Sequence, residues 1–235
     1  MKINDVLILA GGKGTRVKSR SKGLPKVLMK INKRPFIDIQ VDWLKKQNIK
    51  NFYLLLKYKN SLITKYILSK KDIDNINFFF INEKEYLGTG GAIKNALRYR
   101  KKNEHCLVVN GDTFFYKKNI KSFINYHLKN KSMLTIGCSL KKDIKRYGKV
   151  YTNGNILNRI DPPKGISESG YVYSGILIIS PKIIQEFYLR KFSIEKFIKY
   201  FSKKNKTFVF KFLSKNFFYD YGTESSYDKV KKIGF

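Results

Sequence analysis

Long apolar runs are missing from this chain of 235 residues. The longest ones, such as residues 78–81 and 175–179, are the length of a strand and fall far short of the ~20 residues that cross a bilayer. The apolar run near the N-terminus is too short, and has the wrong flanks, for a signal peptide. We therefore expect a cytoplasmic protein with no membrane span.

Cysteine and histidine are also scarce. Cys106 and Cys138 stand in apolar segments without a spacing typical of metal ligands, so we expect buried, reduced thiols and no zinc site or disulfide framework. His105 and His127 have no evident partners in the sequence, and no Ser-His-Asp set can be assembled around either. The sequence therefore gives no indication of nucleophilic catalysis.

Acidic residues are few: 17 Asp and Glu stand against 49 Lys and Arg, for a formal charge of +32. Such a charge attracts polyanions, and association with nucleic acid, with a membrane surface or with another anionic polymer stays open. However, the lysines are spread along the whole chain, and Lys, Asn, Ile, Phe and Tyr are abundant together. This pattern favours compositional drift combined with attraction for small anionic substrates, and we expect no specific nucleic-acid partner.

The first half of the chain alternates between two hydrophobic periodicities, as expected for a globular α/β protein. The period of 3.6 predicts helices at residues 36–47, 62–68 and 90–99, and strand-like runs occupy residues 6–10, 51–57, 76–81 and 106–109. Repeated strand-helix-strand units of this length predict a parallel, doubly wound sheet whose ligands bind at the carboxyl ends of the strands.

The second half is richer in strands. It has strand-like segments at residues 132–140, 149–152, 155–160, 171–179 and 207–213, and helical ones at 181–188 and 193–201. Asn153-Gly154 is a hairpin signal, and residues 217–223 lead into a short terminal helix. We expect this half to extend the same sheet.

A glycine-rich loop follows the first strand. Residues 10–16 read AGGKGTR, and Lys26 follows Pro25 ten residues after Arg16. Glycines let a backbone approach phosphate closely, and the two cations can contact phosphate oxygens. A Walker loop is absent, and the dinucleotide fingerprint fails because Val17 stands where its third glycine would be. The loop therefore predicts a polyphosphate site of another kind.

Six motifs together resemble the sugar-phosphate nucleotidyltransferases over nearly the whole chain. They are AGGKGTR (10–16), LPK (24–26), LGTGGAI (87–93), NGD (110–112), YGKV (147–150) and FYDYGTESSYDKV (218–230). LGTGGAI, NGDTFF and RYGKV are most similar to the D-glycero-D-manno-heptose 1-phosphate guanylyltransferase branch. The resemblance implies an α/β, Rossmann-like nucleotidyltransferase fold with a mixed, mostly parallel sheet and a small β extension over the sugar site. It also implies one domain, with a nucleotide-binding half up to about residue 130 and a sugar-phosphate-binding half after it.

The reaction that this resemblance implies joins an NTP to a sugar 1-phosphate, giving an NDP-sugar and pyrophosphate. A sugar phosphate oxygen attacks the α-phosphorus in line, so the chain needs positioning cations and carboxylates for Mg²⁺. By match to the family motifs, Arg16 and Lys26 bind the phosphates, and Asp112 and Asp220 are the metal ligands. Arg16, Lys26 and Asp112 are the implied catalytic residues.

The resemblance assigns the nucleotide to two loops. The implied contacts are Leu9, Gly11, Gly12, Gly14, Thr15 and Arg16 from the first, and Gly88 and Thr89 from the second. Glu83 stands five positions before Gly88, where the family carries a residue that reads the base. A carboxylate only accepts hydrogen bonds, and guanine offers it two adjacent donors, N1–H and the 2-amino group. Glu83 therefore favours GTP, with CTP second because cytosine offers a 4-amino donor.

The sugar-phosphate side departs from the family pattern. Tyr147 and Gly148 match the family's sugar-contacting pair, but Asp161 and Lys164 replace a Glu-Lys pair, and Tyr173 stands where asparagine is usual. Two alternatives stay open: a cytidylyl- or uridylyltransferase acting on another phosphorylated sugar or polyol, and a noncatalytic nucleotide- or polyanion-binding protein. The sequence does not give the oligomeric state, so a homodimer is also open.

Overall fold

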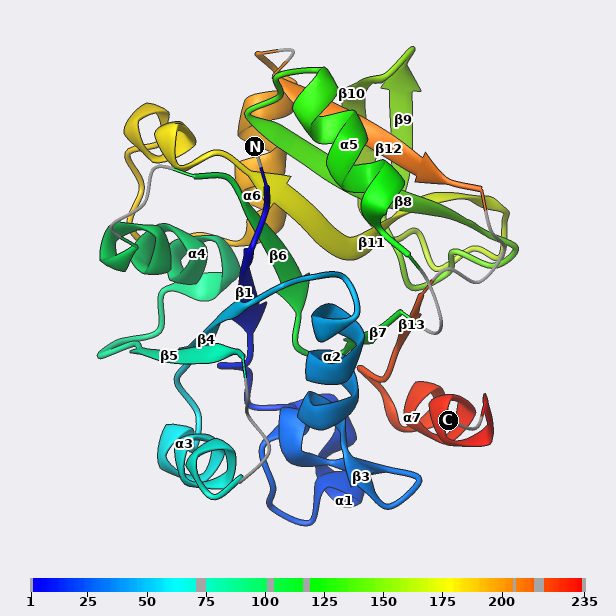
Figure 1. Ribbon diagram of the computed structural model, residues 1–235. Coiled ribbons are helices and arrows are strands. Elements are labelled where there is room, and N and C mark those ends of the chain that lie inside the picture. Colours follow the sequence, from blue (N-terminus) through cyan, green and yellow to red (C-terminus); the bar gives the residue numbers. More distant parts are fainter. Residues whose placement is uncertain are drawn as a thin grey trace.

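A nine-stranded mixed sheet contains strands from both halves of the chain (Figure 1). The computed structural model describes residues 2–70, 75–100, 104–115, 119–204, 206–213 and 218–233, without the side chains of residues 184 and 185. The strands of the large sheet, in spatial order, are β5 (Asn77–Asn82), β4 (Asn51–Leu56), β1 (Asp5–Leu9), β6 (Cys106–Asn110), β11 (Gly170–Ile179), β8 (Leu134–Lys141), β12 (Thr207–Phe212), β10 (Ile156–Asp161) and β9 (Lys149–Asn153).

The sheet is mixed but mostly parallel, as the resemblance implied. Strands β5, β4, β1 and β6 pair in parallel, and β12 is parallel to β8. Only β10 and β11 run against the other strands of this sheet. The carboxyl ends of β1, β6 and β8 therefore lie at one edge of the sheet, where ligands bind in folds of this kind.

Helices cover both faces of the sheet, because its central strands are apolar on both sides. On β1, Val6 and Ile8 pack in one core with α2 (Phe36–Lys45), α3 (Asn60–Leu68) and α5 (Lys121–Lys129). Leu7 points to the opposite core, with α4 (Gly88–Tyr99) and α6 (Ile194–Ser202). This two-sided covering confirms the doubly wound architecture.

A third, smaller core lies beyond the carboxyl edge and attaches the end of the chain. Helix α7 (Glu224–Ile233) and the short strand β13 (Tyr219–Asp220) pack there against the segments that follow β1 and β6. Strand β13 pairs antiparallel with β7 (Thr113–Phe114) as a separate two-stranded sheet. The other short elements of this region are η1 (Thr15–Val17), α1 (Lys18–Ser21), η2 (Lys26–Leu28), β2 (Lys30–Ile31) and β3 (Arg34–Pro35).

The strands of the second half form a ring of pairings. Strand β11 is bulged between Tyr173 and Leu177, so that its first part pairs with β8 and β9 and its second part with β8 and β6. Strands β9 and β10 form the hairpin that Asn153-Gly154 predicted, and β10 touches β12. This hairpin is the small β extension of the main sheet.

Two local expectations differ from the structure. No helix was predicted between residues 112 and 132, where α5 lies, and the predicted helix at 181–188 is a 3-10 helix, η3 (Pro181–Glu186). The predicted run into α7 begins at Phe217, which lies outside the described residues. Cys106 and Cys138 are buried and free, as expected, and burial raises the pKa of the Cys106 thiol to about 12.

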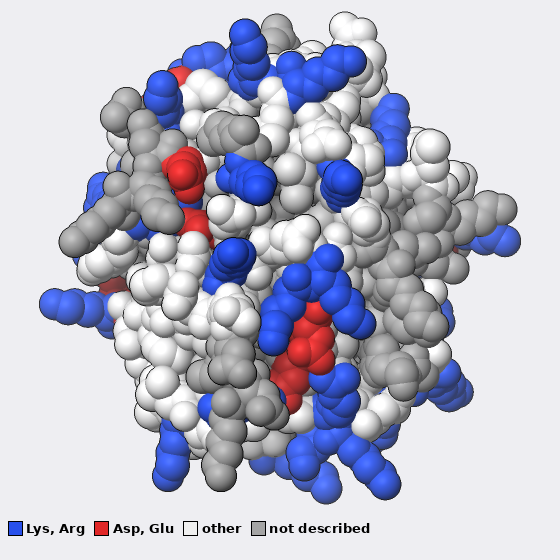
Figure 2. All heavy atoms as spheres, viewed as in Figure 1, with Lys and Arg blue, Asp and Glu red and all other residues white. Residues whose placement is uncertain are grey.

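Basic side chains are scattered over the face in Figure 2, and one acidic group over the region of α2 is bordered by basic residues. In that region Asp38 pairs with Lys70 and Asp42 with Arg34. The dispersion agrees with the spread of lysines along the sequence. Among the described residues, no helix is both long and apolar enough to cross a membrane.

Candidate active site

The glycine loop lies at the carboxyl end of β1 and is held against β4. A Cβ atom at Gly11 would lie 3.2 Å from the backbone nitrogen of Lys57, and the Ala10 N–H donates to the Leu55 carbonyl. Gly14 adopts φ +64°, which favours glycine. Within the described residues, the backbone N–H groups of Gly12 and Gly14 have no backbone acceptor. The loop therefore presents free donors at the sheet edge.

The two predicted phosphate cations are held differently. Arg16 is exposed in η1 and has no hydrogen-bond or ion-pair partner among the described residues. Lys26 is largely buried, with 13% of its side chain exposed, and its Nζ lies 2.5 Å from Oδ2 of Asp112. Arg16 is thus free to reorient, whereas Lys26 is fixed beside a carboxylate.

Asp112 is placed by a tight turn after β6. A Cβ atom at Gly111 would lie 2.4 Å from the carbonyl oxygen of Leu9, so only glycine fits there. The buried Gln40 on α2 donates from Nε2 to the carbonyl oxygens of Asn110, at 2.9 Å, and Thr113, at 3.2 Å. These contacts fix both sides of the NGD turn.

Asp220 comes to the same place from the other end of the chain. It pairs with Thr113 in the two-stranded sheet of β13 and β7, and the Tyr221 N–H donates to the Asp112 carbonyl at 3.2 Å. A Cβ atom at Gly222 would lie 3.1 Å from Oδ1 of Asp220, 3.6 Å from Nζ of Lys26 and 3.8 Å from Oδ2 of Asp112. The two predicted metal ligands and the predicted catalytic lysine therefore surround one point.

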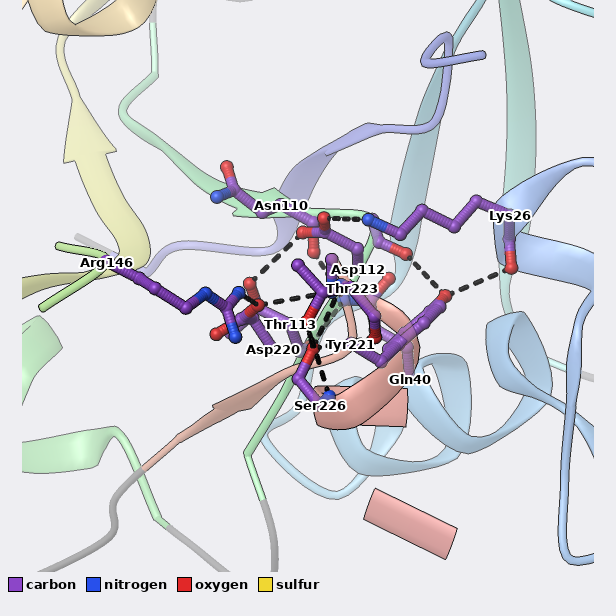
Figure 3. A network of polar contacts seen from close by, with 12 residues as sticks. Lys26, Gln40, Asn110, Asp112, Thr113, Arg146, Asp220, Tyr221, Thr223 and Ser226 are labelled. Carbon is purple, nitrogen blue, oxygen red and sulfur yellow. Dashed lines mark hydrogen bonds and ion pairs between the residues drawn. The ribbon is translucent and has the colours of Figure 1, made fainter. Parts of the chain in front are cut away.

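Two cations approach the aspartates from opposite sides (Figure 3). Lys26 binds Asp112, and Arg146 donates to Oδ1 of Asp220 at 2.9 Å. The Tyr147 hydroxyl donates to Oδ2 of Asp220. Burial alone would raise the pKa of Asp220, but the hydrogen bond from Tyr147 and the charge of Arg146 outweigh it and lower that pKa. Asp220 is therefore held as a carboxylate.

The segment that carries Asp220 is anchored on both sides. The start of α7 is capped reciprocally, because the Ser226 N–H donates to the Thr223 hydroxyl and the Thr223 N–H to the Ser226 hydroxyl. Tyr221 is fully buried, and its hydroxyl lies 3.1 Å from the carbonyl oxygen of Lys26 and 3.2 Å from that of Gly111. One tyrosine thus joins the segments of Lys26, Asp112 and Asp220.

The predicted base site is partly occupied by internal contacts. One carboxylate oxygen of Glu83 accepts from the Leu87 N–H at 3.0 Å, and burial raises the pKa of this carboxyl despite that bond and the nearby Lys57. The Thr89 hydroxyl accepts from the Ile194 N–H. Gly88, at φ +74°, allows the chain to pass Phe192, whose carbonyl a Cβ atom would meet at 2.5 Å. The second carboxylate oxygen of Glu83 has no partner among the described residues.

Of the predicted sugar-phosphate residues, Tyr147, Gly148 and Asp161 lie close together, whereas Lys164 is exposed and Tyr173 packs elsewhere. Gly148 packs on the backbone of Asp161, because a Cβ atom at Gly148 would lie 2.6 Å from the Asp161 carbonyl oxygen. Tyr147, Asp161 and Lys164 line one small depression. However, Asp161 pairs with Arg159, and Lys164 is exposed without a partner among the described residues. Tyr173 precedes the bulge of β11 and packs on the opposite core.

Four further residues shape the site and were missed in the sequence. They are Gln40, Lys141, Arg146 and Tyr221. Gln40 left a signal, because it is a polar residue on the apolar face of the helix predicted at 36–47. Arg146 and Tyr221 stand within the matched motifs RYGKV and FYDYGTESSYDKV but were given no role there, whereas Lys141 only follows a predicted strand.

The expectation that the two histidines lack partners was wrong. Nδ1 of His105 lies 2.6 Å from Nε2 of His127, and Nδ1 of His127 lies 2.7 Å from the Thr135 hydroxyl. Burial lowers the pKa of His127 to about 3. The pair lies at the amino end of β6, whereas Asp112 follows its carboxyl end, so it belongs to the framework. No group of three or more His, Cys, Asp or Glu side chains arranged to hold a metal occurs among the described residues.

Known proteins resemble this chain over nearly its full length. It is 35% identical over 222 residues to D-glycero-alpha-D-manno-heptose 1-phosphate guanylyltransferase of Campylobacter jejuni, covering 94% of this chain and 96% of that protein. The protein of the same name from Aneurinibacillus thermoaerophilus is 32% identical over 231 residues, 97% of each chain.

Solved structures agree in fold. The crystal structure of HddC from Yersinia pseudotuberculosis has a TM-score of 0.84 and 35% sequence identity, covering 98% of this chain and 99% of that one. The same protein complexed with GMP-PN has a TM-score of 0.83. The model of the family described as "Nucleotidyl transferase" matches residues 5–233. This protein therefore belongs to the nucleotidyl transferase family.

Proposed function

We propose that this protein is a guanylyltransferase that joins GTP to a heptose 1-phosphate, giving GDP-heptose and pyrophosphate. The observation that carries the transferase chemistry is the convergence of Lys26, Asp112 and Asp220 on one point at the carboxyl edge of the sheet. The choice of GTP and of the heptose rests on the Campylobacter and Aneurinibacillus relatives and on the HddC complex with GMP-PN.

The reaction needs positioning and charge neutralisation by the protein. An oxygen of the sugar phosphate attacks the α-phosphorus of GTP, one P–O bond forms, and the bond to the pyrophosphate leaving group breaks. The free N–H groups of the glycine loop and the side chain of Arg16 would bind the phosphates. Lys26 would offset the charge that grows at the α-phosphoryl group, after its ion pair with Asp112 opens.

The donor set fits Mg²⁺. Mg²⁺ is commonly bound in proteins through one or two carboxylates together with substrate phosphates, and the carboxylates of Asp112 and Asp220 lie around one point. When bound there, Mg²⁺ would neutralise phosphate charge and orient the phosphoryl group. Lys26 and Arg146 form ion pairs with these two carboxylates.

The remaining assignments follow the same edge of the sheet. We assign the nucleotide to Leu9, Gly11, Gly12, Gly14, Thr15, Gly88 and Thr89, with Glu83 reading the base through its unpartnered oxygen. Thr89 would contribute its backbone, because its hydroxyl is already bonded. We assign the sugar side to Tyr147, Gly148, Asp161, Lys164 and Tyr173.

The test is a direct assay of both products. The purified protein is incubated with MgCl₂, GTP and D-glycero-α-D-manno-heptose 1-phosphate, and pyrophosphate release and GDP-heptose formation are followed by coupled assay and mass spectrometry. The other three NTPs and a panel of sugar 1-phosphates are run in parallel. Absence of pyrophosphate with every combination would overturn the transferase assignment, and a preference for another NTP would overturn the assignment of GTP.

A further inference from the structure

Lys141 lies at the carboxyl edge of the sheet, near Asp220, but was assigned no role from the sequence. It is the last residue of β8, and β8 runs parallel to β12 and in the same direction as β1 and β6. Its side chain therefore emerges at the same carboxyl edge as Asp112. In this edge region it reaches Phe218, two residues before Asp220.

The ammonium group of Lys141 is compensated by the faces of aromatic rings and by one carbonyl rather than by a carboxylate. Nζ lies 4.0 Å from the centroid of the Phe218 ring and 5.6 Å from those of Tyr147 and Tyr219. It donates one hydrogen bond, to the neutral carbonyl of Phe218 at 2.9 Å. Among the described residues, it forms no ion pair.

The charges nearby add to this imbalance. Lys229 and Arg146 repel Lys141, and Asp220 is the carboxylate close enough to attract it. Asp220 is itself already bonded to Arg146 and Tyr147. Burial and the two cations outweigh Asp220 and lower the pKa of Lys141 to about 8. A half-buried lysine in such surroundings is poorly compensated unless an anion joins it.

Lys164, which was predicted from the sequence to bind the sugar phosphate, lies in different surroundings. Lys164 follows β10 in an exposed loop, where it has no contact with Asp220 or Arg146 among the described interactions. It would have to be ordered on binding, whereas Lys141 is already fixed by its carbonyl and aromatic contacts. Preorganised cations bind phosphate at a lower cost in side-chain entropy.

We propose that Lys141 is the residue that binds the phosphate of the sugar 1-phosphate, together with Arg146 once the latter leaves Asp220. The ligand class is a phosphate monoester dianion, whose charge would balance the cluster of Lys141, Arg146 and Lys229. This inference rests on the proposed function, because it names the cation that one of its two substrates would meet.

The experiment compares Lys141→Met with Lys164→Met, which removes the same charge from the exposed loop. For each variant, KM is measured separately for D-glycero-α-D-manno-heptose 1-phosphate and for GTP, and calorimetry gives the Kd of the sugar phosphate. We expect Lys141→Met to raise the KM and Kd of the sugar phosphate roughly ten- to hundredfold, as for loss of a hydrogen bond to a charged group. The KM for GTP should change less than twofold, Lys164→Met should raise the KM of the sugar phosphate by less than Lys141→Met does, and Lys141→Arg should restore most of the affinity.

Three results would overturn the inference. One is a fall in kcat or a rise in the KM for GTP with an unchanged KM for the sugar phosphate, because Lys141 would then only position the Asp220 segment. The second is a larger effect of Lys164→Met than of Lys141→Met, and the third is an unchanged Kd in Lys141→Met. Lys141→Gln replaces Lys141→Met if the latter does not show the wild-type melting transition.

The experiments distinguish a failure of the Lys141 proposal from a failure of the proposed function. If the wild type turns over no substrate pair, the proposed function fails, and calorimetry with inorganic phosphate still tests the cation cluster. Loss of phosphate binding in Lys141→Met would then support the site, and unchanged binding would contradict it. If the wild type is active and Lys141→Met is indistinguishable from it, only the inference fails.

Discussion

The two sides of the site differ in how firmly the fold holds their side chains. On the nucleotide side, Gly111 leaves no room for a Cβ atom, Lys26 is bound to Asp112, and Tyr221 joins three segments. On the sugar side, Lys164 is exposed, and Asp161 pairs with a neighbour two residues away. The residues that we propose for the reaction are thus firmly held, whereas those that we propose for sugar choice lie on a hairpin, a loop and a bulge. A chain can therefore keep its chemistry while its sugar specificity changes.

The largest effect should come from Asp112→Asn. This change keeps the shape of the side chain but removes a carboxylate that would hold Mg²⁺, so we expect kcat to fall on the order of 10³-fold with every sugar 1-phosphate. Pyrophosphate release measures it. The control is Asp143→Asn, an exposed residue whose one side-chain bond within the described part of the chain is to the local Lys145 N–H. Equal, near-zero rates in Asp112→Asn and wild type would instead favour a noncatalytic binding protein.

Lys26→Met should have the next largest effect. The lysine is positioned to neutralise phosphoryl charge, so we expect roughly a 10²-fold loss in kcat. The loss should be the same for different sugar 1-phosphates, because Lys26 belongs to the nucleotide side. Lys13→Met, an exposed loop lysine two residues before Thr15, is the matched control. A loss in kcat that differed between sugar 1-phosphates would contradict the separation of a nucleotide side from a sugar side.

Glu83→Gln should affect the base and its pH dependence. Because burial raises the pKa of Glu83 above its ordinary value, its carboxyl becomes neutral as the pH falls through that raised pKa, and it then accepts poorly from guanine. We expect GTP affinity of the wild type to decrease over that acidic range. The variant should bind GTP about tenfold more weakly at neutral pH and show a flatter profile. Nucleotide titrations with GTP and ATP from pH 5 to 8 measure both, and an unchanged preference for GTP would remove Glu83 from base recognition.

The smallest effect, and the one that most sharpens the comparison, should come from Tyr173→Asn. It introduces the asparagine that the family resemblance led us to expect before the bulge of β11, so the ratio of kcat/KM between two sugar 1-phosphates should shift by about fivefold. The KM for GTP should stay the same. Tyr171→Asn, two residues earlier on the same strand face, tests whether any tyrosine loss there has this effect. A change in GTP affinity alone would place Tyr173 with the nucleotide side.

Much of the fold was readable from the sequence because its signals are periodic and local. The apolar runs of β1, β4 and β6 and the helical spacing of α2 and α4 predicted their positions within two residues. The α5 helix escaped because its signal is short: among its residues, only Phe123 and His127 are buried. Pairing of β7 with β13 could not be predicted, because two-residue strands have no periodicity and lie far apart in the chain.

The site could be predicted from the sequence where its residues belong to matched motifs. Residues of the AGGKGTR, NGD and YDYG motifs come together around Lys26 and the two aspartates. The sequence could not show which other side chains interact with the charges of this cluster. The ion pair of Arg146 with Asp220 and the aromatic surroundings of Lys141 arise from strands that meet only in the folded sheet.

Asp220 has a consequence for when the enzyme becomes active during its own synthesis. Its segment leaves the ribosome after all nine strands of the main sheet, since β12 ends at Phe212. A nascent chain can therefore complete its sheet before it contains Asp220, one of the two carboxylates that we propose for Mg²⁺. We therefore expect transferase activity to appear only after β13 has paired with β7.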